Sequence, residues 1–341
     1  MSIVYFRNMI LVTGGTGLVG SHLLYHLSLN YDRIRAIHTQ TSDLNAVKKV
    51  FANYTENSEA LFNKIRWVEA DLNNIPELEM AFDGITRVYH CAALVSFVAS
   101  DYHHMRRVNI EGTTNIVNLC IASQVEKLCY VSSVAAIENS QAGVLVDETD
   151  NWNSENVKSG YAITKYGAEM EVWRASQEGI PVVIVNPGVI LGSGFWHKGS
   201  GKMFSKVNRG LKFYTEGITG FVGVQDVVYL MQRLMDSNIS NERYILVAEN
   251  LSFKAVLTMI AQALDKEKPR IRVTKWMGEI FWRLEYLRSK ITLSTPLLTR
   301  YSARSSVSNH PYDASKIKKE LGFEFEDVST AVQRTAKHFK N

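Results

Sequence analysis

The sequence predicts an α/β fold, a doubly wound parallel sheet with helices on both faces, joined to a smaller, mostly helical C-terminal part. Three observations predict it. Short β-branched runs alternate with segments of helical periodicity through the first half of the chain. A glycine-rich turn lies between the first such run and the first helical segment. Beyond Pro187 the alternation gives way to a glycine-rich loop and then mainly helical patterns.

The predicted strands are short apolar runs, and the predicted helices carry apolar residues on one face. The strands are expected at 9–13, 33–39, 65–71, 87–94, 127–135, 182–186 and 243–249. Helices are expected at 18–29, 112–125, 161–179 and 226–237, followed by 252–264, 276–290, 313–322 and 329–339.

The chain of 341 residues is longer than one small core requires. We therefore expect two intimate domains. Residues 1–190 and 221–250 form the nucleotide-binding domain, and residues 191–220 and 251–341 form the substrate-binding domain.

Composition excludes several classes of protein. The net charge of +4 is spread without a Lys/Arg block, so we expect no nucleic-acid partner. No apolar run reaches the roughly 18 residues that span a bilayer, so we expect no membrane partner. The three cysteines, Cys91, Cys120 and Cys129, form no CxxC pair, which favours a reducing, cytoplasmic location without disulfides. His22 and His26 lack the adjoining Glu of a zinc protease, and no metal site is expected.

The stretch TGGTGLVG at 13–20 allows two interpretations. One is the common fingerprint Gly15-x-Gly17-x-x-Gly20, and the other is the narrower pattern Thr13-Gly14-x-x-Gly17-x-x-Gly20. Both predict a Rossmann-type site, because missing side chains let the backbone approach a pyrophosphate at a helix N-terminus. The cofactor implied is NAD(P)(H).

The preference between NAD and NADP stays open in the sequence. A ribose 2′-hydroxyl is normally held by an acid about 20 residues after the glycines. Here the second strand ends in His38-Thr39-Gln40-Thr41-Ser42, without an acid before Asp43 or an Arg for a 2′-phosphate. The hydroxyls of Thr39, Thr41 and Ser42 could serve either cofactor.

Tyr161 and Lys165 are spaced i,i+4 on a predicted helix, so their side chains share one face. A nearby ammonium lowers the pKa of a phenol, which suits Tyr161 as a proton donor to a carbonyl or acceptor from an alcohol. Two other pairs share this spacing, Tyr286/Lys290 and Tyr312/Lys316. Only the first follows a strand that ends in serines, and packing accounts better for the others.

Ser132 and Ser133 end the fifth predicted strand. Ligands of open α/β sheets bind outside the carboxyl ends of strands, where a hydroxyl can bond a substrate oxygen. The alternative is that both serines satisfy the local backbone.

Taken together, these motifs resemble the extended short-chain dehydrogenase/reductase family, also called the NAD-dependent epimerase/dehydratase family. The matching pieces occur in family order: the Thr13–Gly20 pattern, Asp71-Leu72, HCAA at 90–93, Asn109 in VNIEGTTN, YVSS at 130–133, Tyr161-x-x-x-Lys165, NPGVILGSG at 186–194 and YDASKIKKELGF at 312–323. The resemblance makes Gly14, Gly17 and Gly20 the operative glycines, with Gly15 in a variable position.

The resemblance also implies roles for single residues. Ser133 would polarise the substrate carbonyl, and Tyr161 would be the acid/base. Lys165 would hold the cofactor ribose and lower the pKa of Tyr161. Asn109 resembles the family's helix-kink and proton-relay asparagine, with a helix cap as the alternative. The implied cofactor contacts are Gly14, Thr16, Gly17, Leu18, Val19, Gly20, Thr39, Asp71, Leu72, Ala92, Ala93, Lys165, Pro187, Gly188 and Val189.

Within the family, nucleotide-sugar enzymes carry R-x-x-N-x-Y-G after the sixth strand, where this chain has Asn186, Val189 and Leu191. NPGVILGSGFW instead resembles dihydroflavonol reductase-like and hydroxysteroid dehydrogenase-like members. We therefore expect an NAD(P)-dependent oxidoreductase acting on a small ketone or secondary alcohol. The alternatives are a nucleotide-sugar epimerase/dehydratase and a non-catalytic NAD(P)-sensing regulator. The resemblance further implies a homodimer through helices 112–125 and 161–179.

Overall fold

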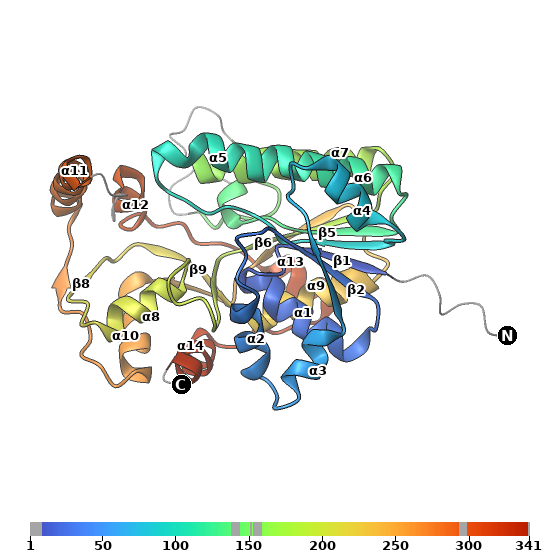
Figure 1. The fold of residues 1–341 in the computed structure, drawn as a ribbon. Coiled ribbons are helices and arrows are strands. Elements are labelled where there is room, and N and C mark those ends of the chain that lie inside the picture. Colours follow the sequence, from blue (N-terminus) through green and yellow to red (C-terminus); the bar gives the residue numbers. More distant parts are fainter. Residues whose placement is uncertain (1–8, 138–143, 151, 153–158, 293–298, 340–341) are drawn as a thin grey trace.

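A seven-stranded parallel sheet forms the centre of the molecule in a computed structural model that describes residues 9–137, 144–150, 152, 159–292 and 299–339 (Figure 1). The strand order is β10-β6-β5-β4-β1-β2-β3. The strands are β1 (Ile10–Thr13), β2 (Ile34–His38), β3 (Ile65–Glu69), β4 (Arg87–His90), β5 (Lys127–Val131), β6 (Val182–Pro187) and β10 (Glu242–Leu246). Every predicted strand is present, and the Rossmann-type prediction is confirmed.

Helices cover both faces of this sheet (Figure 1). One face carries α1 (Leu18–Asn30), α2 (Leu44–Ala52), α3 (Ser58–Asn63), α9 (Val224–Asp236) and α13 (Ser315–Leu321); the other carries α4 (Ile75–Phe82), α5 (Tyr102–Arg106), α6 (Gly112–Ala122) and α7 (Gly160–Gln177). Strand side chains alternate between the two cores. Ile10 and Val12 pack with α1 and α9, whereas Leu11 packs with α4, α6 and α7.

Two predicted strands are shorter than their apolar runs suggested. β4 ends at His90 rather than residue 94, because from Ala92 onward backbone N–H groups bond to side chains. The Ala92 N–H donates to Thr13 Oγ1 at 3.2 Å, and the Leu94 N–H donates to Asn109 Oδ1 at 2.7 Å. β5 ends at Val131, and the chain turns through a 3-10 helix, η4 (Val134–Ala136).

A third hydrophobic cluster lies apart from the main sheet. It joins α8 (Gly201–Asn208), α10 (Phe253–Ala263) and α14 (Val328–Phe339) around Phe204, Ile260 and Val332. The C-terminal part also contains two small sheets that the sequence did not predict. They comprise β7 (Val189–Leu191), β9 (Ile218–Gly223) and β11 (Glu249–Ser252), and β8 (Phe213–Tyr214) paired with β12 (Ile271–Arg272).

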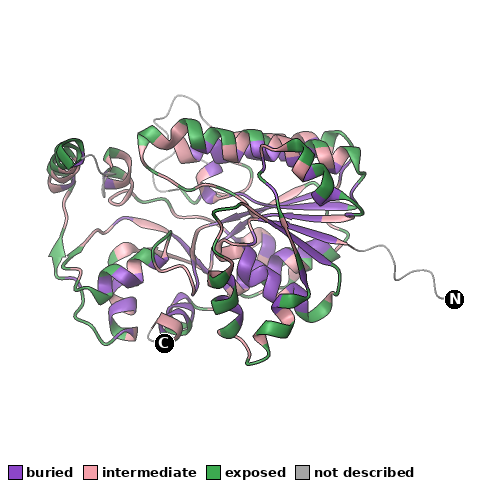
Figure 2. Cartoon of the chain, in the orientation of Figure 1, coloured by how far each residue is buried: buried purple, intermediate pink, exposed green. Residues whose placement is uncertain are grey.

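Three further elements complete the C-terminal half. α11 (Lys275–Thr292) and α12 (Arg300–Ser305) lie at one end of the molecule, and α11 is largely exposed (Figure 2). α13 instead packs on β10, and its Ala314 and Ile317 join the core of the main sheet. No helix in the described part of the chain is long and apolar enough to cross a membrane.

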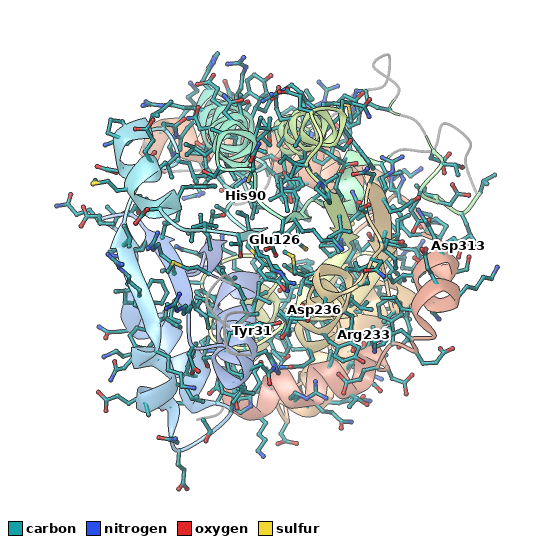
Figure 3. All side chains as sticks on the ribbon, turned by 90° about the vertical axis from the view of Figure 1, so that its right-hand side faces the viewer. Tyr31, His90, Glu126, Arg233, Asp236 and Asp313 are labelled. Atoms are coloured by element: carbon teal, nitrogen blue, oxygen red, sulfur yellow. The ribbon has the colours of Figure 1, made fainter. Side chains whose placement is uncertain are left out.

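A cluster of polar side chains lies at the amino ends of the strands (Figure 3). The Arg87 guanidinium pairs with Asp236 at 2.8 Å and with Glu126 at 3.5 Å, and the Tyr31 hydroxyl donates to Asp236 at 3.2 Å. Lys127 Nζ donates to the Leu234 carbonyl at 2.6 Å. These contacts connect α1 and α9 to the sheet, so the polar cluster at this edge stabilises the fold.

Buried His22 links three segments on the face of the sheet that α1 covers. Its Nε2–H donates to the Ser193 carbonyl at 3.0 Å, so Nδ1 accepts from the Tyr54 hydroxyl. The Tyr54 oxygen in turn accepts from Gln225 Nε2 at 2.5 Å. Burial lowers the pKa of His22 to about 4, so the ring is neutral at pH 7. The described residues hold no group that could bind a metal ion, and His22 has a structural role.

The neutral state of His22 predicts acid destabilisation. Its pKa in the folded chain lies below the ordinary 6.5, so the unfolded chain binds the extra proton between pH 6.5 and 4. Stability is therefore expected to fall by about 2 kcal/mol between pH 7 and pH 5 through this residue. In urea unfolding, the loss of stability between pH 7 and pH 5 should be smaller by that amount in His22→Gln than in the parent. The exposed variant His104→Gln should lose as much stability as the parent. Equal pH dependence in all three proteins would contradict the assignment.

Candidate active site

The carboxyl ends of β1, β4, β5 and β6 converge on one edge of the sheet. The strand order reverses between β1 and β4, where a crevice for a ligand is expected in an open α/β sheet. All the predicted site residues lie on segments that leave this edge or on the helices beside it.

The glycine turn approaches the segment after β4 too closely for side chains. A Cβ on Gly14, whose φ is +66°, would lie 2.5 Å from the Ala92 nitrogen, and one on Gly20 would lie 2.2 Å from the Gly14 carbonyl oxygen. The Gly17 N–H donates to that same carbonyl at 2.9 Å and Gly17 is the N-cap of α1. This compact turn at a helix N-terminus suits a dinucleotide pyrophosphate.

Gly15 differs from these three glycines. A Cβ there would meet the end of the Leu24 side chain at 2.7 Å and Ala36 at 3.4 Å, both of them side-chain atoms. The backbone collisions at Gly14 and Gly20 agree with the narrower glycine pattern. Thr16, Leu18 and Val19 are half-buried between these glycines.

Hydroxyl groups line the turn after β2. Ser42 Oγ lies 3.1 Å from Thr39 Oγ1 and 3.4 Å from Thr16 Oγ1, which connects this turn to the glycine turn. Asp43 caps α2, where its Oδ1 accepts from the Asn45 and Ala46 N–H groups. The structure therefore leaves the choice between NAD and NADP as open as the sequence does.

The remaining predicted cofactor contacts lie at the ends of β3, β4 and β6. Asp71 is exposed, and Leu72 is buried beside Gly112, where a Cβ would lie 2.9 Å from the Leu72 Cβ. Ala92 is half-buried and Ala93 exposed after β4. Three further contacts follow β6: Pro187 ends the strand, Gly188 approaches the Gly220 carbonyl, and Val189 begins β7.

Helix α7 places Tyr161 and Lys165 on its sheet-facing side. Ser159 caps the helix by accepting from the Ala162 N–H at 3.0 Å. Lys165 is buried, and its Nζ donates to the Tyr130 hydroxyl at 2.8 Å and to the Val131 carbonyl at 2.7 Å. One of its three hydrogens remains for another acceptor.

Ser133 and Tyr161 lie near one another at the edge of the sheet, where the Ser133 side chain acts to lower the pKa of the phenol. Ser133 Oγ also accepts from the Ala135 N–H at 3.2 Å, so its own proton is free to be donated to an oxygen. Ser132 has a different partner, because its hydroxyl donates to buried Glu169 at 2.6 Å. Of the two serines, only Ser133 faces the phenol.

The pKa of Tyr161 differs from the expectation. Burial raises it above 10, and the Ser133 side chain counteracts only part of that shift. Burial likewise lowers the pKa of Lys165 to about 7, against the attraction of Glu169 and Cys91. Lys165 is directed at Tyr130 and Val131, so in the chain alone the expected lowering of the Tyr161 pKa does not occur.

Asn109 lies in a π-helical turn, η3 (Arg107–Glu111), between α5 and α6. Its buried amide holds both backbone groups of Leu94: Oδ1 accepts from the N–H at 2.7 Å, and Nδ2 donates to the carbonyl at 3.0 Å. Nδ2 also donates to Thr164 Oγ1 at 3.0 Å, one residue before Lys165. The side chain thus fixes the loop after β4 against α7, rather than capping a helix.

A buried chain of hydrogen bonds links the glycine turn to Asn109. Thr13 Oγ1 accepts from the Ala92 N–H and therefore donates to His90 Nδ1 at 2.6 Å. His90 Nε2–H then donates to Thr113 Oγ1 at 2.9 Å, and that hydroxyl donates to the Asn109 carbonyl at 2.6 Å. Burial lowers the pKa of His90 to about 3, which keeps this directional chain intact at neutral pH.

The aromatic neighbours of Tyr161 were not predicted. Phe97 lies edge-on to Tyr161 at 5.9 Å between ring centroids and stacks on Tyr301 of α12 at 6.0 Å. Trp196, in the C-terminal part, packs against Phe204 and Phe339. Phe97 follows β4 in an apolar run, and that position was the only signal available.

The two other Tyr-x-x-x-Lys pairs lie elsewhere. Tyr286 is exposed on α11, with Lys290 Nζ 5.7 Å above its ring. Lys316 instead pairs with Glu242 and lies over the ring of Tyr244. Tyr312 lies beside Gly220, near Gly188 at the end of β6, but its Lys316 is directed away from that edge to Glu242.

Comparisons with known proteins agree with this geometry. The NAD-binding family described as "Male sterility protein" matches residues 12–217. A protein of Synechocystis sp., provisionally named dihydroflavonol 4-reductase, is 29% identical over 97% of this chain and 94% of its own. "Sterol demethylase protein B" of Methylococcus capsulatus is 26% identical over 92% of both chains, and UDP-glucose 4-epimerase of Vibrio cholerae is 26% identical over 81% of both.

Solved structures share the whole fold. The crystal structure of gox2253 matches with a TM-score of 0.80 and 27% identity over 98% of both chains. The glycine turn, the carboxyl edge and these similarities agree on one conclusion: the chain belongs to the NAD-binding family of male sterility proteins, within the extended short-chain dehydrogenase/reductase family of NAD(P)-dependent enzymes.

Proposed function

We propose that this enzyme interconverts a small ketone and its secondary alcohol with Tyr161 as the acid/base. The single observation that carries the proposal is the proximity of the Ser133 hydroxyl to the Tyr161 phenol at the carboxyl edge of the sheet. Two proton donors on one side of that edge suit a carbonyl oxygen that gains negative charge during reduction. Bound NAD(P)H supplies the hydride.

The neighbouring residues would hold these two groups in place. Ser133 would donate to the substrate oxygen, because the Ala135 N–H leaves its proton free. Lys165 would hold the cofactor ribose with its remaining hydrogen, and Asn109 would fix the loop that carries Ala92 and Ala93. The Thr13–Gly20 turn, Thr39, Asp71-Leu72 and Pro187–Val189 would line the rest of the cofactor site.

The substrate side favours an apolar or aromatic molecule. Phe97 packs on Tyr161, Tyr301 stacks on Phe97, and Val95 in the loop that carries Phe97 is exposed. We place substrate binding in the C-terminal part, at 191–220 and 251–341, with the exception of α13, whose packing assigns it to the sheet. A sterol-related name among the relatives agrees with an apolar substrate.

The second candidate is a nucleotide-sugar epimerase, because one relative carries that name. The position that holds Arg in such enzymes is Asn186 here. It is buried, and its Nδ2 donates to Glu169 at 2.9 Å and to the Ser133 carbonyl at 3.1 Å. An amide engaged in this way cannot hold a diphosphate, which favours the reductase. Retention of Tyr161 and Lys165 disfavours a non-catalytic regulator.

Replacing Tyr161 by Phe tests the proposed function. With a panel of ketones and NADH or NADPH, the loss of the proton donor should lower kcat by about 10²–10⁴-fold and change KM little. Consumption of the reduced cofactor is read by absorbance. Tyr166→Phe, one turn away on the outer side of α7, is the matched control and should keep full activity. Turnover of nucleotide-sugars but not ketones, or undiminished activity of the Tyr161 variant, would refute the proposal.

The pKa of Lys165 predicts how cofactor affinity depends on pH. In the chain alone Lys165 loses its proton near pH 7, and an anionic cofactor raises that pKa on binding. Affinity for NADH should therefore decline as pH rises through 7. Titration by protein fluorescence should show this decline in the parent and a flatter profile in Lys165→Gln. If the affinity of Lys165→Gln for NADH declined equally over the same pH range, the decline would arise from a titrating group other than Lys165.

We also propose that α6 and α7 pair with a second copy to form a homodimer. Ile163 and Met170 are exposed on the outer face of α7, one either side of Tyr166. Light scattering should give twice the chain mass, and Ile163→Glu with Met170→Glu should give the monomer. A monomeric parent would exclude this dimer.

A further inference from the structure

A row of large apolar side chains runs along the exposed face of α11. The row comprises Trp276, Ile280, Leu284, Leu287 and Ile291, which are between 45% and 79% exposed. Their spacing of three and four residues places them on one side of the helix. Single exposed apolar residues are ordinary, but a contiguous row marks an interaction surface. We call these five residues the α11 stripe.

The opposite side of α11 already has its partners. Gly278 faces Ala303 of α12, Phe281 lies 6.1 Å from Phe213, and Ser289 is buried. In the part of the chain that the structure describes, no element covers the α11 stripe. Figure 2 shows the helix at the edge of the molecule with most of its surface exposed. The stripe is therefore directed away from the protein core.

Positive charge is concentrated around the α11 stripe. Residues 266–305 contain ten Lys and Arg but three Glu, a net charge of +7 in a chain whose total is +4. At 100° per residue, Arg283 and Lys290 border one side of the stripe and Arg288 the other. Several of these cations pair with Glu on the same surface, but the excess remains positive.

We propose that the α11 stripe docks this enzyme on an anionic membrane surface. Apolar side chains that include Trp, bordered by basic residues, lie in the boundary between headgroups and acyl chains. Anionic lipids supply the complementary charge, and they are enriched in the cytoplasmic leaflet. This proposal revises the expectation of no membrane partner, which considered only spanning segments.

The location of α11 connects such docking to the active site. Arg304 of α12 donates to Glu279 of α11 at 2.6 Å, and Tyr301 of α12 stacks on Phe97 beside Tyr161. A docked α11 would hold this end of the molecule at the lipid surface, where an apolar substrate is concentrated. The docking goes beyond the proposed function. Vesicle binding is measured without turnover, so a failure of membrane docking and a failure of the proposed reaction are distinguishable.

Vesicle co-sedimentation of the full chain tests the proposal. Vesicles of phosphatidylcholine alone are compared with vesicles containing about one third phosphatidylserine. The parent should bind the anionic vesicles, and its tryptophan fluorescence should shift to the blue, with no such shift in Trp276→Phe. Leu284→Glu with Leu287→Glu should weaken binding roughly tenfold or more, because two side chains no longer enter the lipid. Lys290→Glu should weaken it by about tenfold and only on anionic vesicles.

Matched controls lie on other surfaces. Leu29→Glu with Met80→Glu changes two equally exposed apolar residues on α1 and α4, and Lys49→Glu reverses an exposed charge on α2. These variants should bind like the parent. Absence of parent binding to both kinds of vesicle would overturn the proposal. An equal loss of vesicle binding in the stripe and control variants would also overturn it. A fall in solution mass for the stripe variant would also overturn it, because the stripe would then be a contact between copies.

Discussion

The active site depends on two buried ionisable side chains on α7. Lys165 and Glu169 are one turn apart and both inaccessible to solvent, and the carboxylate raises the pKa of the lysine against the larger effect of burial. Charges can be buried only where hydrogen bonds satisfy them. Glu169 accepts from Ser132, Asn186 and Arg243, which lie after β5, on β6 and on β10. The pair thus joins α7 to three segments of the sheet.

This anchoring explains why the reactive groups lie where they do. Lys165 donates to Tyr130 and Val131, the last two residues of β5, directly before the two serines. With Glu169 and Lys165 fixed, Tyr161 one turn earlier can only extend beyond the strand ends, where it lies near Ser133. On the other side, Asn109 holds Thr164 and the loop after β4. The phenol is therefore positioned from two directions by buried polar contacts.

The sequence predicted much of this because the motifs are local. Strand runs, the glycine turn and the i,i+4 pair each depend on neighbouring residues. The missed features depend on contacts between distant segments. Phe97 and Tyr301 are separated by two hundred residues, and the pairing of Asn109 with Leu94 is visible only when the π turn forms. The end of β4 at His90 was missed for the same reason, since side chains from β1 and η3 capture the backbone beyond it.

Desolvation shifts the pKa values of both Tyr161 and Lys165. It raises the pKa of Tyr161 and lowers that of Lys165, so burial favours the neutral form of both groups. A protonated phenol is the form needed to donate to a carbonyl, and the site is therefore poised for reduction before any ligand arrives. Oxidation of an alcohol instead requires the phenolate, which an ammonium at residue 165 would stabilise. Because the phosphates of a bound dinucleotide favour that ammonium, cofactor binding adjusts the same pair toward the reverse reaction.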